Sequence, residues 1–179
     1  METIECGTSR ESGKKQIALI FDREQLLYDI KNLCYVEGHI MEDGTSDEVR
    51  HTVQDVGETG NEDRVIRVLD MAHADVVERL YPFTEREIDS PVLDDRLRDK
   101  PVYGIVLNVP QTFSQTTFNL LGKLIHELLV CTSVADWMSI TNSAKEEAWR
   151  RKIESVHIRI NQVKSRRTGR TRLRQHWLG

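Results

Sequence analysis

The sequence predicts a mainly α-helical protein: a bundle of about five helices with a small β element, a strand or hairpin, projecting near residues 85–109. Three observations support this fold class. Apolar residues recur at intervals of three and four in five segments, the spacing of one buried helix face. Several segments open with Ser, Asp or Asn, which cap the free N–H groups of a helix start. Residues 102–109 are rich in β-branched residues and bracketed by prolines, as is typical of a strand.

Two strands are expected in this chain. Residues 16–21 form a short apolar run that predicts the first strand, and residues 102–109 predict the second. The second strand could pair with the first or fold back on residues 85–92. The sequence leaves both pairings open.

The first helix is expected to begin at Asp22, which can cap it, with Gln25 three residues later as the partner in a capping box. Gly44 is the expected end of this segment. Its apolar stripe consists of Leu26, Leu27, Ile30, Leu33, Cys34, Ile40 and Met41. Ser46 predicts the cap of a short second helix, in which Val49, Val53 and Val56 recur at helical spacing.

The third helix is expected to begin at Asn61 and to stop before Pro82. Residues 114–140 and 143–165 then predict two long antiparallel helices that form the spine of the bundle. The first of them, capped by Ser114, is apolar around most of its circumference, which indicates a central helix. The second opens with Ser143 and Glu146, the signature of a capping box.

The domain organisation follows from these elements. Residues 1–15 are polar and read as a flexible leader, residues 16–165 as a single helical domain, and residues 166–179 as a basic C-terminal arm. The N-terminus has no signal-peptide pattern, and no apolar run approaches the ~18 residues that span a bilayer. We therefore expect a protein that does not enter a membrane.

Positive charge is concentrated at the C-terminus. Residues 151–179 carry nine Lys and Arg against one acid, whereas residues 1–150 carry 16 basic and 28 acidic residues. Such asymmetry indicates a polyanionic or acidic partner for the arm, because guanidinium groups pair with phosphate or carboxylate. The alternative is a solvated tail that only keeps the protein soluble. Trp177 argues against this alternative, because such a tail has little use for an exposed Trp. The candidate partner-binding residues are Arg166, Arg167, Arg170, Arg172, Arg174 and Trp177.

The same reasoning predicts how the arm is used. Gly169 disfavours a helical continuation of the last helix, so the arm should leave the bundle. We expect it to dock on another subunit, where its arginines meet carboxylates and Trp177 fills an apolar pocket. DNA phosphate is the alternative acceptor.

Motifs for catalysis are not supported. The stretch Gly7–Lys14 resembles a phosphate-binding loop, but it has five residues between its glycines instead of four, and Lys15 stands where Ser or Thr is required. His126 and Glu127 lack the second histidine of a helical zinc motif. Cys34 and Cys131 lie among apolar residues, as core thiols do. We therefore expect no enzymatic activity, no cofactor and no metal.

Three stretches resemble the head–tail connector (neck, or head-completion) proteins of tailed bacteriophages. The first is Asp22-Arg-Glu-Gln-Leu-Leu-Tyr-Asp29. The second is Asn61-Glu-Asp-Arg-Val-Ile-Arg-Val-Leu69, together with Tyr81-Pro82. The third runs from Leu124–Cys131 through Ala135–Asn142 and is followed by a helix and an Arg-rich end. The resemblance is one of whole segments and covers roughly residues 16–175. It carries no catalytic residue.

The resemblance implies a structural virion protein of the neck, assembled in the host cytoplasm. Such subunits form a homo-oligomeric ring, a dodecamer by the resemblance, below the portal, and the ring contacts the portal protein and adjacent neck or tail proteins. DNA passes through its channel without sequence-specific binding. An acidic body suits such a channel, because negative walls do not hold phosphate. The alternative function is nucleic-acid binding through the Arg-rich arm, which the acidic body would oppose.

Overall fold

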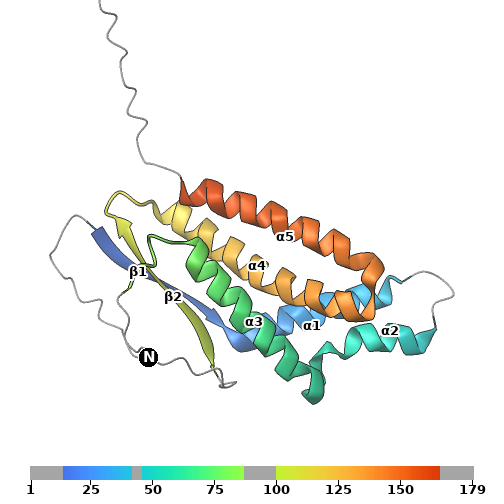
Figure 1. The fold of residues 1–179 in the computed structure, drawn as a ribbon. Helices are drawn as coiled ribbons and strands as arrows, with labels where there is room; N and C mark the ends of the chain where they lie inside the picture. The colour runs from blue at the N-terminus through green and yellow to red at the C-terminus, as the bar shows by residue number, and fades with distance from the viewer. Residues whose placement is uncertain (1–13, 42–45, 87–99, 166–179) are drawn as a thin grey trace, which may run out of the picture.

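The computed structural model describes residues 14–41, 46–86 and 100–165. Within them a helical bundle packs against a small sheet (Figure 1). The elements in chain order are β1 (Lys14–Asp22), α1 (Arg23–His39), α2 (Asp47–Gln54), the short 3-10 helix η1 (Asp55–Gly57), α3 (Thr59–Arg79), β2 (Val102–Pro110), α4 (Gln115–Thr141) and α5 (Ser143–Lys164). The predicted fold class, a mainly α bundle with a small β element, is confirmed.

The β element is a two-stranded antiparallel sheet in which β1 pairs with β2, from Lys14 opposite Pro110 to Asp22 opposite Val102. The sequence left open whether residues 102–109 pair with residues 16–21 or fold back on residues 85–92, and the structure shows the pairing with the first strand. Alternate residues of β2 are buried, as expected for a strand with one face on the core. β1 begins at Lys14, so the strand starts two residues before the predicted 16–21 and takes in the last residues assigned to the leader.

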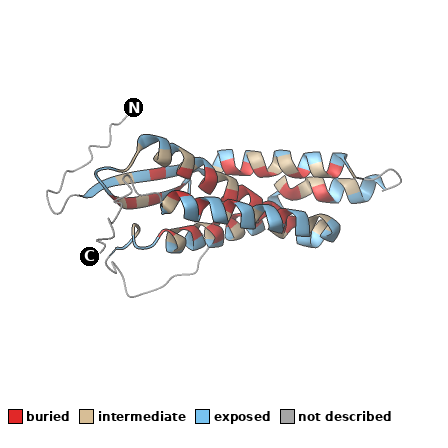
Figure 2. Ribbon diagram, turned by 90° about the horizontal axis from the view of Figure 1, so that it is seen from above, coloured by how far each residue is buried: buried red, intermediate tan, exposed pale blue. Residues whose placement is uncertain are grey.

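α4 is the central helix. It contacts α1, α2, α3 and α5, and α5 returns antiparallel along it, so the predicted spine is confirmed. Figure 2 shows the buried residues gathered along the inward sides of the helices and the sheet. By length and composition alone α4 would also suit a membrane span, but its apolar side chains belong to the core of this bundle. The buried residues of α4 are Leu121, Leu124, Ile125, Leu128, Leu129, Val130, Cys131, Ser133, Val134, Ala135, Trp137 and Met138.

The predicted caps are borne out at two helix starts. The carboxylate of Asp22 accepts a hydrogen bond from the backbone N–H of Gln25 at 3.0 Å. The hydroxyl of Ser46 accepts one from the N–H of Val49 at 3.4 Å. The Gln25 side chain does not complete the capping box; it donates forward to Asp29 at 3.1 Å.

The capping box predicted at Ser143 is wrong. α4 and α5 are joined by the single residue Asn142, which is itself the N-cap of α5 and whose carbonyl oxygen accepts from the N–H of Lys145 at 3.0 Å. Ser143 is therefore already helical. Glu146 instead accepts from Arg150, one turn later, at 2.6 Å. Ser114 is the N-cap of α4 as predicted, but its side chain makes no capping hydrogen bond.

Two helix boundaries and two apolar positions also differ from the prediction. α1 ends at His39, so Ile40 follows the helix with its side chain 55% exposed, and Val49 of α2 is 42% exposed. α3 begins at Thr59, because the carbonyl oxygen of Glu58 already accepts from the N–H of Asn61 at 2.9 Å. The end of α3 at Arg79 agrees with a stop before Pro82.

Hydrogen bonds and ion pairs hold the outer helices on α4. The buried indole N–H of Trp137 donates to the carbonyl oxygen of Val53 at 2.8 Å, which fixes α2 against the core. Arg64 of α3 makes a two-pronged contact with Asp136 of α4, at 2.9 and 3.2 Å. These ties hold α2 and α3 against α4.

Candidate assembly surfaces

The residues that the sequence identifies as partner-binding, Arg166, Arg167, Arg170, Arg172, Arg174 and Trp177, lie outside the described residues. The structure does place the point from which the arm starts. α5 ends at Lys164, whose amine donates to the carbonyl oxygen of Arg79 at the end of α3. The arm therefore begins at the corner where α3 and α5 both end.

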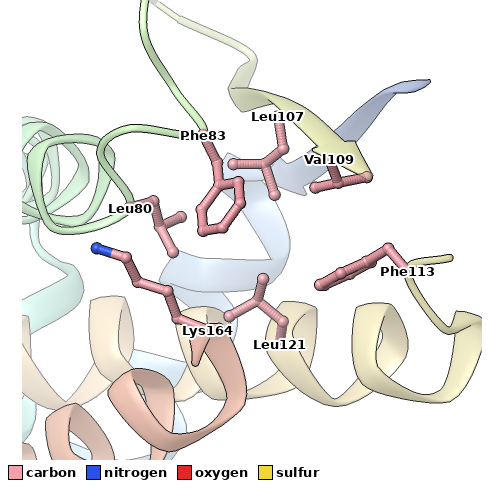
Figure 3. A pocket seen from close by; sticks show the side chains of 7 residues that line it. All are labelled: Leu80, Phe83, Leu107, Val109, Phe113, Leu121 and Lys164. Atoms are coloured by element: carbon pink, nitrogen blue, oxygen red, sulfur yellow. The ribbon is translucent and has the colours of Figure 1, made fainter. Parts of the chain in front are cut away.

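A small apolar crevice lies beneath this corner (Figure 3). The stem of Lys164 lines one side of it, and the amine points away from the ring of Phe113. Its volume is only about 10 Å³, close to what one water occupies, so it has no room for the indole of Trp177. The side chains that line it are Leu80, Phe83, Leu107, Val109, Phe113, Leu121 and Lys164.

The outer side of α1 carries exposed aromatic and apolar side chains, which we call the α1 face: Tyr28, Tyr35, Val36 and His39. Tyr28 is 65% and Tyr35 58% exposed, and the ring of Tyr35 stacks on His39 at 6.3 Å. Tyr28 and Tyr35 are seven residues apart, so they lie on one side of the helix. Because Tyr is enriched at protein interfaces, Tyr28 and Tyr35 make the α1 face a candidate contact surface.

An open groove of about 430 Å³ runs between β1 and the N-terminal half of α4. Its exposed apolar wall includes Ile20, which is 60% exposed. β1 lies close over α4 here: a Cβ atom on Gly122 would stand 3.2 Å from the side chain of Leu19. The residues that line the groove are Leu19, Ile20, Phe21, Phe118, Asn119, Gly122, Lys123 and His126.

His126 closes one end of this groove. Its Nε2 lies 2.8 Å from a carboxylate oxygen of Asp29 on α1, and its ring contacts that of Phe21 at 6.4 Å. In residues 14–41, 46–86 and 100–165, no three His, Cys, Asp or Glu side chains gather as metal ligands would. The geometry of His126 is that of a partly buried link between α1 and α4.

The outer side of the C-terminal half of α3 forms a second exposed surface, which we call the α3 face: Met71, Ala74, Asp75, Glu78 and Tyr81. Met71 is 66% and Tyr81 54% exposed. The spacing of three and four residues places these side chains on one side of the helix and the turn that follows it. This face combines exposed apolar atoms with two carboxylates.

A polar cluster joins the start of β2 to α3. The amine of Lys100 lies 3.0 Å from a carboxylate oxygen of Asp70, and the ring of His73 hydrogen-bonds the carbonyl oxygen of Gly104 at 3.1 Å. Burial lowers the pKa of His73, so the ring is neutral at pH 7 and donates its N–H. Burial, reinforced by Asp70, raises the pKa of Tyr103. The cluster anchors β2 to the bundle.

The sequence predicts the arm as a partner-binding segment but does not predict the α1 or α3 face. The signal for the α1 face was present in the seven-residue spacing of Tyr28 and Tyr35, opposite the leucine stripe. The signal for the α3 face was weaker, because Asp75 and Glu78 resemble the solvated side of any surface helix.

Comparisons with known proteins supply no further constraint: no protein-family model, no curated protein and no solved structure matches this chain. The basis for a proposed function is therefore the resemblance of three sequence stretches to head–tail connector proteins, together with the surfaces described above.

Proposed function

We propose that this chain is a structural virion protein of a tailed bacteriophage, a head–tail connector subunit that forms a closed ring below the portal. The ring joins the capsid to the tail and leaves a channel for DNA. The observation that carries this proposal is the pair of unlike exposed surfaces on one helical bundle. The α1 face is aromatic, whereas the α3 face is acidic with two large apolar side chains.

Two different surfaces are what a ring requires. In a head-to-tail ring each subunit presents one patch to the preceding copy and another to the following copy, whereas a two-fold dimer uses the same patch twice. α1 and α3 each pack on α4, and each keeps an exposed outer side. The groove beside Ile20 adds a further apolar contact area near the sheet.

The charge distribution supports the same reading. Residues 1–150 carry 28 acidic against 16 basic residues, so a channel lined by the body would repel DNA phosphate and let the duplex slide. Nucleic-acid binding through the arm is the competing function. It predicts tight, salt-sensitive binding of DNA by the isolated protein, whereas a connector subunit has no need of it.

Complementation of a phage that lacks this chain tests the proposal. We expect filled heads without tails in the deletion strain, and infectious particles when the full chain is supplied. Ile20→Glu and Tyr35→Glu should fail to restore them, because each places a charge on a contact surface.

Ile158→Glu is the matched control. Ile158 on α5 is 59% exposed, like Ile20 at 60% and Tyr35 at 58%, but lies outside both surfaces and the groove. It should complement as the unchanged chain does, provided that all three variants melt at similar temperatures. Normal tailed particles in the deletion strain would refute the proposed function.

A further inference from the structure

The carboxylates of the α3 face stand where helix electrostatics favour positive charge. Glu78 lies in the last turn of α3 and Asp75 one turn earlier, near the negative end of the helix dipole. Neither has an ion-pair partner among the residues that the structure describes. Arg79 and Asp75 both act on His157 of α5: burial and then Arg79 lower the pKa of that ring and Asp75 raises it, so Asp75 lies at the edge of the α3 face beside α5.

The charge and apolar content of the arm match this face. The arm carries five arginines within nine residues, together with Leu173 and Trp177, and no acidic residue. Arginines near a helix C-terminus gain from both the carboxylates and the dipole. Exposed Met71 and Tyr81 offer a sulfur and a ring against which Trp177 can pack. Lys164 already places one cation at this helix end, through its bond to the carbonyl oxygen of Arg79.

The maximum span of the arm is compatible with a neighbouring copy. Fourteen residues span at most about 46–50 Å, whereas the eight-residue step from Met71 to Arg79 rises about 12 Å. Because α5 ends beside Arg79, an extended arm would pass over the face of its own subunit with its first residues, and Trp177 would lie beyond that face. On a neighbouring subunit, the distal half of the arm, with Leu173 and Trp177, could cover the face.

We propose that the α3 face is the docking site for the C-terminal arm of an adjacent copy of this chain. The distal arginines pair with Asp75 and Glu78, and Trp177 packs on Met71 and Tyr81. This inference rests on the proposed ring and names the surface that the arm links within it.

Crosslinking between two forms of the full chain tests this docking. The donor form carries Trp177→p-benzoylphenylalanine and keeps its own α3 face intact, so that docking within one chain can also be detected. The acceptor form has an intact face and a tag that changes its mass. After joint assembly and irradiation, we expect crosslinks from donor position 177 to acceptor residues 71–81.

Acceptor variants then test the chemistry. Asp75→Lys with Glu78→Lys in the acceptor should lower the crosslink yield about tenfold, the loss expected when two charge-assisted contacts become repulsive. Arg170→Glu with Arg174→Glu in the donor should restore it. The control changes two exposed acids of α5, Glu147→Lys with Glu154→Lys, and should leave the yield unchanged.

The mass of the same assemblies separates the two proposals. An intact ring whose crosslinks from position 177 lie within one chain, or outside residues 71–81, overturns the docking inference and leaves the connector function standing. A protein that stays monomeric overturns the connector function, and the docking inference with it.

Discussion

Replacing Leu128 with Asp should unfold the bundle or reduce its stability severely. Leu128 is 2% exposed on the central helix, in the core shared by α4 with the other helices and the sheet. Leu128→Ala alone should cost about 3–5 kcal/mol, the range for truncating a fully buried leucine, and lower the melting temperature by roughly 6–20 °C for a chain of this size. Leu128→Asp adds the burial of an unpaired carboxylate, so its cost approaches the whole stability of a typical domain, about 5–15 kcal/mol.

Urea denaturation followed by circular dichroism measures this effect, at one protein concentration because assembly also stabilises. Ile158→Asp is the matched control: the same charge enters a helix at a side chain that is 59% exposed, and the midpoint should hardly move. A Leu128→Asp protein whose midpoint equals that of the unchanged chain would refute the assignment of α4 as the buried spine.

Three further outcomes are expected. Trp137→Phe removes the donor to the buried carbonyl oxygen of Val53 and should cost about 1–3 kcal/mol, measured in the same denaturation assay; an unchanged midpoint would show that the bond does not hold α2. Burial, and then Glu37, raises the pKa of Cys34 to about 12, so this thiol should resist iodoacetamide at pH 8 until urea unfolds the chain, and rapid labelling of native protein would contradict its burial. Removing residues 166–179 should leave the melting temperature within a few degrees of the full chain's but abolish incorporation into particles, because the described core lies entirely upstream.

The spine of the bundle was predictable because its signals are local. α4 is apolar around most of its circumference, and the polar residue Asn142 separates its stripe from that of α5. The strand at 102–109 was predictable for the same reason, since its β-branched residues and flanking prolines act within one segment. The start of α1 followed from Asp22, whose side chain reaches only its own first turn.

Features set by distant contacts were not predictable. The choice of β1 as the partner of β2 depends on residues some ninety positions apart, and no local pattern ranks one pairing above another. The Ser143 cap failed because α4 and α5 meet at a single residue, a property of the tight turn between two packed helices. The α3 face and the full extent of the α1 face became visible once the fold showed which sides of these helices the described residues leave uncovered.

The mass of the purified full chain tests the central claim most directly. Native mass spectrometry and light scattering at assembling concentrations should show a closed oligomer whose mass is a fixed multiple of 20.7 kDa, twelve copies by the resemblance to connector proteins, and electron micrographs should show a ring with a central channel. A chain that remains at 20.7 kDa, or that stops at a two-fold dimer, would contradict the account.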